Sequence, residues 1–152
     1  MSRIIGRGRY GRETYPEAPR PILAAPGRIK SLQNGVPLPL LQVDISQIQP
    51  PDRTFAARLQ FAAECTDSTD AQIRQGDCNS AAAYKAPNFT TSQAQTTTNA
   101  FTAGNLTTTF SWTTSGTVAT LNVTVTTTLA VPTDFKFHYN VVFATHTQFT
   151  FL

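Results

Sequence analysis

Charged side chains are scarce in this chain. Asp, Glu, Lys and Arg together make up 14% of its 152 residues, whereas an ordinary globular protein carries about 25%. No run of about 18 apolar residues occurs, so no segment has the length of a membrane-spanning helix. Arginines and prolines also interrupt the N-terminus where a secretion signal would need an apolar stretch. These absences predict that the protein has no membrane partner.

Residues that commonly bind metals or perform catalysis are also few. The chain has two Cys and two His, and it lacks a phosphate-binding glycine loop, a dinucleotide fingerprint, a CxxC pair and a nucleophile elbow. His138 and His146 would need Cys, Asp or Glu at ligand spacing to hold zinc. We therefore expect no metal site, no cofactor and no enzymatic activity. For Cys65 and Cys78 two alternatives are open, one disulfide or two buried free thiols.

Positive charge is present and is concentrated at the N-terminus. Residues 1–30 carry seven basic and two acidic side chains, a net charge of +5, whereas the remaining chain carries five basic and seven acidic ones, a net charge of −2. Eight of the ten prolines lie between Pro16 and Pro51, and proline favours extended backbone. We predict that residues 1–50 form an extended, basic, proline-rich N-terminal arm.

The predicted arm also carries apolar side chains, which a flexible linker would lack. We expect the first of these, and the arginines between them, to contact a partner protein: Arg3, Ile4, Ile5, Arg7, Arg9, Tyr10, Arg12, Tyr15, Ile22 and Leu23. The stretch GRGRYGR also has the character of nucleic-acid-binding segments, in which arginine neutralises phosphate and tyrosine stacks on a base. It is short and not repeated, so a protein partner is favoured over a nucleic-acid partner.

Residues 51–152 are predicted to form one Thr-rich antiparallel β domain. Residues 54–65 alternate between apolar and polar residues, which favours a strand over a helix. Residues 66–86 are polar and are predicted to form a long loop. From residue 87 onward Thr makes up about a third of the chain, and alternating segments are separated by turn residues. These segments are 106–112, 121–125 and 135–141.

This pattern is typical of an all-β fold, an antiparallel β-sandwich or barrel of the jelly-roll or β-tulip kind. Edge strands of soluble sheets are usually protected by charged side chains. From residue 87 to the end, only Asp134 and Lys136 are charged. We expect the edges to be covered by another copy of the chain or by the arm of a neighbour, so a homo-oligomer is predicted.

The arm from GRGRYGR to Pro51, followed by the Thr-rich sheet of residues 89–152, resembles small virion structural proteins. Among these it is most similar to the cement, decoration and minor capsid proteins of bacteriophages and other viruses. The resemblance implies a non-enzymatic protein of the virion whose arm binds a major capsid protein or another virion protein.

Two alternatives to a capsid protein are open. One is a structural component of a phage tail, neck or baseplate, which would share the all-β, oligomeric character. The other is a carbohydrate-binding or adhesive β-sandwich, which would need an aromatic platform on its surface. Trp112 is the single Trp, and its alternation with Phe110 places it in the core instead.

Overall fold

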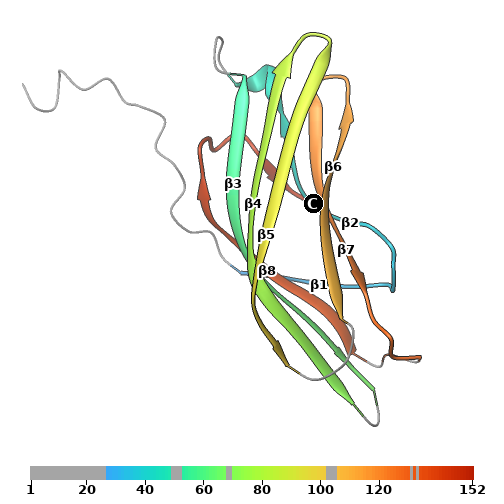
Figure 1. The fold of residues 1–152 in the computed structure, drawn as a ribbon. Helices are drawn as coiled ribbons and strands as arrows, with labels where there is room; N and C mark the ends of the chain where they lie inside the picture. The colour runs from blue at the N-terminus through green and yellow to red at the C-terminus, as the bar shows by residue number, and fades with distance from the viewer. Residues whose placement is uncertain (1–26, 49–52, 68–69, 102–105, 131, 133) are drawn as a thin grey trace, which may run out of the picture.

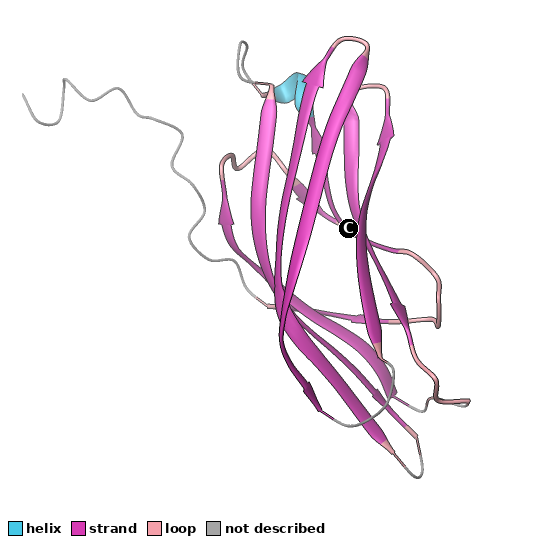
Figure 2. Cartoon of the chain, in the orientation of Figure 1, coloured by secondary structure: helices cyan, strands magenta, loops and turns pink. Residues whose placement is uncertain are grey.

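The protein is a two-layered β-sandwich (Figure 1). The computed structural model describes residues 27–48, 53–67, 70–101, 106–130, 132 and 134–152. These residues form two antiparallel sheets that pack face to face and do not close into a barrel. Besides strands they contain one short 3-10 helix, η1 (Ile45–Gln47; Figure 2), and none of their helical segments has the length and apolar character to cross a membrane. The predicted all-β sandwich is confirmed.

Each sheet brings together segments that are distant in the sequence. Sheet A has five strands in the order β1-β8-β3-β4-β5, and sheet B has four in the order β6-β7-β2-β9. The strands of sheet A are β1 (Arg28–Ser31), β3 (Thr54–Thr66), β4 (Ala71–Lys85), β5 (Asn88–Phe101) and β8 (Asp134–Ala144). Those of sheet B are β2 (Leu38–Asp44), β6 (Thr107–Ser115), β7 (Val118–Thr126) and β9 (Thr150–Phe151). The edges of sheet A are thus β1 and β5.

The core lies between the two sheets and is built from alternate residues of each strand. In β3, Phe55, Leu59 and Phe61 are buried while Arg58 and Gln60 are exposed, so the strand predicted over residues 54–65 is confirmed. The period of two sends every second side chain to the same face, which is why this pattern predicts a strand.

An aromatic cluster occupies the middle of the core. The ring of Phe137 in β8 lies 5.7 Å from that of Phe61 in β3 and 6.2 Å from that of Phe110 in β6, measured between centroids. Phe110 therefore joins sheet B to the two central strands of sheet A. The Tyr139 hydroxyl donates a hydrogen bond of 3.0 Å to the carbonyl oxygen of Leu40, which links β8 to β2 across the sandwich.

The predicted loop over residues 66–86 is wrong for most of its length, because β4 occupies residues 71–85. β4 is an inner strand, paired with β3 on one side and β5 on the other. Its inward side chains are small or polar, among them Gly76, Cys78 and Ser80, so the sequence shows no apolar stripe. Gly76 is required there, since a Cβ atom would lie 2.0 Å from the carbonyl oxygen of Thr96 in β5.

Part of the predicted arm belongs to the sandwich. Within residues 27–48, β1 pairs with β8 in sheet A, and β2 lies between β7 and β9 in sheet B. Leu40, Leu41 and Val43 of β2 are fully buried. Pro39 does not break this strand because the register shifts between Pro39 and Leu41, and proline is tolerated at such irregularities. Residues 28–48 of the predicted arm therefore belong to the sandwich, and residues 1–26 lie outside the described part.

Cys65 and Cys78 are buried free thiols, so the disulfide alternative is excluded. Cys65 lies opposite Gln72, and Cys78 lies opposite Leu59, in the ladder between β3 and β4. The two cysteines are thus six steps apart along the ladder, or about 20 Å, whereas a disulfide needs Cα atoms within about 7 Å. Burial raises the pKa of the Cys78 thiol to about 12 and also raises that of Cys65.

Candidate interaction surface

The residues predicted to contact a partner all lie in residues 1–26, outside the described part of the chain. These are Arg3, Ile4, Ile5, Arg7, Arg9, Tyr10, Arg12, Tyr15, Ile22 and Leu23. A candidate site on the described residues must therefore be sought on the faces and edges of the two sheets. In these residues no three His, Cys, Asp or Glu side chains are grouped so as to hold a metal ion.

Three ion pairs lie on the outer face of sheet A. Arg58 lies 3.4 Å from Asp77, and Lys136 lies 2.9 Å from Asp134. The third pair joins His138 to Glu64, with Nε2 and Oε1 2.9 Å apart. The first pair joins β3 to β4, the second lies along β8, and the third joins β8 to β3. All three pairs are partly exposed, and exposed ion pairs contribute little to stability.

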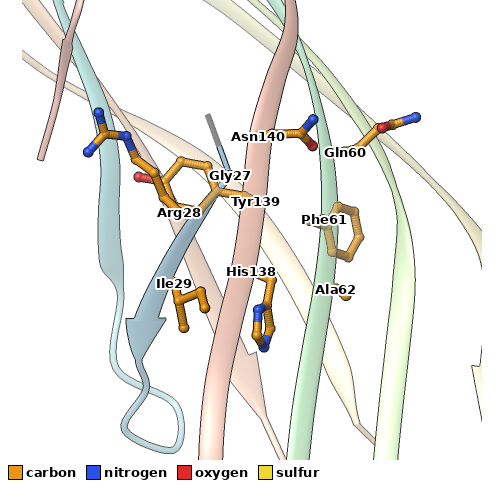
Figure 3. A pocket seen from close by; sticks show the side chains of 9 residues that line it. All are labelled: Gly27, Arg28, Ile29, Gln60, Phe61, Ala62, His138, Tyr139 and Asn140. Carbon is orange, nitrogen blue, oxygen red and sulfur yellow. The ribbon is translucent and has the colours of Figure 1, made fainter. Parts of the chain in front are cut away.

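A hollow of ≈ 390 Å³ adjoins β1 on this side of the molecule (Figure 3). Ile29, His138 and Ala62 form a row across three neighbouring strands, β1, β8 and β3, because the register places them opposite one another. The Ile29 side chain is 64% exposed. The Arg28 guanidinium lies 3.8 Å from the centre of the Phe151 ring in β9 and so covers the open side of the core at this edge.

A second part of the surface carries no charge, and we call it the neutral side. It comprises β5, β6 and β7, which all fall between Lys85 and Asp134, and residues 86–133 contain no Asp, Glu, Lys or Arg. β5 is the edge of sheet A, β6 is the edge of sheet B, and hydrogen bonds join these two strands. One long uncharged stretch of sequence therefore forms one continuous lateral side of the sandwich.

The outer face of β6 and β7 is covered with hydroxyl groups. The register sets Thr109 opposite Thr124 and Thr113 opposite Thr120. The hydroxyls of Thr107 and Thr126 are also joined by a hydrogen bond. β-branched threonines suit the pleated strand and pair across it, so this face is both regular and polar.

β5 presents the longer of the two neutral edges. It is bonded to β4 along one side only. The side chains of residues 90–96, TTSQAQT, are all exposed. Soluble proteins usually protect such an edge with Lys, Pro, a bulge or a covering loop, and residues 88–96 have no charged residue, no proline and no shift in register. This edge is therefore open to pairing with another strand.

Trp112 helps to hold the neutral side together. It is partly buried against the core, and its indole nitrogen donates a hydrogen bond of 3.3 Å to the carbonyl oxygen of Ser92. Gln95 and Thr108 exchange two further bonds, of 2.7 and 3.0 Å. The predicted placement of Trp112 beside Phe110, facing inward, is confirmed, although burial of Trp112 is incomplete. Its contacts join the two sheets, which a surface platform for sugars would not do.

The scarcity of charge after residue 87 is visible in the sequence, but where these residues lie on the folded surface is not. The pattern shows that β5 and β6 are uncharged, whereas their placement at adjacent edges of different sheets follows from the strand order. The signal that could have found this surface is the long uncharged interval between Lys85 and Asp134, which spans two of the predicted strands, 106–112 and 121–125.

No protein-family model matches this sequence, and neither does any curated protein. Among solved structures, the tailspike protein of Acinetobacter baumannii phage AM24 aligns over 84% of this chain, with 11% identity and a TM-score of 0.45. The tailspike protein of Acinetobacter phage vB_ApiP_P1 aligns over 83%, with 13% identity and a TM-score of 0.42. The chain spans 28% and 22% of those two proteins. With TM-scores below 0.5, neither match assigns a family or an activity to this chain.

Proposed function

We propose that this protein is a non-enzymatic structural component of a virus particle, where it joins neighbouring subunits through its neutral side and its N-terminal segment. The observation that supports this most is the neutral side itself. It combines an exposed, uncharged edge strand with a hydroxyl-covered sheet face over residues 86–133.

The chemistry of the neutral side suits contact with protein. The centres of protein interfaces are depleted of charged residues, because each charge that is buried there loses hydration worth several kcal/mol. Threonine and glutamine side chains exchange a hydrogen bond to water for one to a partner, or keep a bridging water, at little cost. A surface built only from such groups can be covered without leaving a charge unpaired.

The N-terminal segment supplies the second proposed contact. Residues 1–26 have five basic and two acidic side chains, whereas residues 27–152 have seven of each. The whole net charge of +3 thus belongs to the segment that precedes β1. A partner with an acidic surface is favoured, because complementary charge accelerates association and fixes its orientation. The arginines and apolar residues of this segment are the proposed contacts.

Capsid cement or decoration is the first position that we propose in the particle, with the N-terminal segment placed between major capsid subunits. A tail, neck or baseplate component is the second. The second is favoured by the two adjacent neutral edges of β5 and β6, because they allow copies of the chain to assemble with one another.

Particles of the source virus, purified by density gradient, provide the first test. We expect the chain to be present at a fixed copy number by quantitative mass spectrometry, and antibody labelling in the electron microscope to place it on the shell or on the tail. Absence of the chain from intact particles would reject the proposal.

Truncation provides the second test. β1 begins at Arg28, so deletion of residues 2–25 leaves every described strand in place. We expect the truncated chain to keep its β-sheet circular dichroism and thermal unfolding but to lose incorporation into particles. A matched variant with Arg3, Arg7, Arg9 and Arg12 changed to Gln keeps the length and tests the charge alone. Unchanged incorporation of both variants would show that the N-terminal segment is not a contact.

A further inference from the structure

We infer that β5 is a self-association edge, at which two copies of this chain pair antiparallel about a twofold axis and join their two five-stranded sheets into one of ten strands. This inference rests on the proposed use of the neutral side as a contact surface and names its partner. The occupant is a second copy of the same chain.

The direction of the backbone groups of β5 follows from the neighbouring strands. The Tyr84 amide donates to the carbonyl of Arg53 on the β3 side, so even-numbered residues of β4 face β3 and odd-numbered ones face β5. The register pairs those odd-numbered residues with even-numbered residues of β5, for example Ala81 with Ser92. The amide and carbonyl groups of Thr91, Gln93 and Gln95 therefore point to the open edge.

These groups are compatible with a twofold register centred on Gln93. In that register Gln93 lies opposite its own copy, Thr91 lies opposite Gln95, and Thr90 lies opposite Thr96. Thr–Thr pairs across strands are favourable, whereas like charges placed opposite each other are destabilising. Because a twofold axis pairs each strand with itself, any charge near the centre would meet its own sign. Residues 88–97 contain none, which is the charge pattern that self-pairing needs.

The other edge of sheet A is less suited to this pairing. β1 is four residues long and carries Arg28 and Lys30, and short edge strands with basic residues resist strand addition. β5 is fourteen residues long. Both native cysteines are buried. A cysteine introduced on β5 would therefore be the exposed thiol among the described residues.

Cysteine cross-linking of the full chain tests the register. Residues opposite each other in a hydrogen-bonded antiparallel pair have Cα atoms about 5.5 Å apart, which is within disulfide range. We expect Gln93→Cys to form a covalent dimer under mild oxidation. The matched control is Thr90→Cys on the same strand, whose two copies would lie about 20 Å apart in this register. It should not form a disulfide.

Charge insertion tests the association itself. We expect Gln93→Lys to weaken dimerisation about tenfold or more, because it places two ammonium groups at the axis. Thr113→Lys, on the exposed outer face of β6, should leave dimerisation unchanged. Analytical ultracentrifugation across the micromolar range measures both, and thermal unfolding confirms that the variants are folded.

Three outcomes would overturn the inference. These are a wild-type chain that stays monomeric, an oligomer in which Gln93→Cys does not cross-link, and a Gln93→Lys variant that dimerises as tightly as wild type. If the inference fails while the chain is still found in purified particles, the proposed function stands and its neutral side contacts a different protein. If the dimer forms but particles lack the chain, the proposed function fails and the inference stands.

Discussion

Replacement of Phe137 by Ala should lower the free energy of unfolding, because Phe137 lies at the centre of the core. The Phe137 side chain is fully buried. Its ring packs against Phe61 and Tyr139 in sheet A, at 5.7 and 5.8 Å, and against Phe110 in sheet B, at 6.2 Å. Because its neighbours are held by two different sheets, they cannot move together to fill the space that the ring leaves.

The expected loss follows from the size of that space. A buried Phe→Ala change costs about 3–5 kcal/mol, through lost burial and through the cavity that remains. The limited collapse at Phe137 places the expected loss in the upper half of this range. For a chain of this length, each kcal/mol lowers the melting temperature by about 2–4 °C. We therefore expect the melting temperature to fall by about 8–20 °C. The corresponding loss of free energy is a large part of the total stability of a typical domain.

Urea unfolding followed by circular dichroism measures this loss, with thermal unfolding as a second measurement. Phe143→Ala is the matched control, because Phe143 lies on the same strand but is 39% exposed on the outer face. Its replacement should cost about 0.5 kcal/mol or less. The dependence of the unfolding free energy on urea should stay the same in both variants. A loss below about 1 kcal/mol for Phe137→Ala, or equal losses for the two variants, would show that the packing described for the core is wrong.

Three further predictions concern thiols, backbone packing and acid. Cys65 and Cys78 should both resist a thiol reagent at pH 8 in the native protein, because they are buried and their thiols stay protonated. Both should react in denaturant, and no reactive thiol there would reveal a disulfide between them. Gly76→Ala should lower the unfolding free energy by about 1–3 kcal/mol in the urea assay, because its Cβ atom would overlap the Thr96 carbonyl, and no loss would contradict the register between β4 and β5. Hydrogen bonds from Ser46 and Thr117 lower the pKa of Asp44 from its ordinary 3.8, so its contribution is complete above that pH and is lost as the pH falls toward the lower folded value. Wild type should therefore lose stability more steeply than Asp44→Asn below pH 3.8 in acid unfolding, and parallel curves would contradict this.

Regular alternation made much of the sandwich predictable. β3 and β8 each carry large apolar residues on one face, so their period of two is visible in the sequence. The inner face of β4 instead carries Gly76, Cys78 and Ser80, because the larger rings of Phe61 and Phe110 fill the space between the sheets. A strand that contributes space for its neighbours has no apolar stripe of its own, and sequence patterns alone do not distinguish it from a loop.

The N-terminal strands were missed for a different reason. Pro37 precedes β2, and Pro39 lies at its register shift, so neither proline disrupts the ladder, yet both count against a strand when the sequence is considered alone. The neutral side was only partly predictable. Its composition is visible between Lys85 and Asp134, but the adjacency of β5 and β6 depends on the strand order of two sheets.

The strand order of sheet A also sets the spacing of attachment points. β1, which follows the N-terminal segment, lies at one edge of the sheet, and β5 lies at the other. Neighbouring strands are about 4.8 Å apart, so a pair of chains joined at β5 would hold its two β1 strands about 43 Å from each other, measured across ten strands. Two tethers at a fixed separation hold a partner lattice by avidity only when its binding sites repeat at a matching interval. Such a dimer would bind surfaces whose binding sites repeat at about this spacing, and would bind other surfaces more weakly.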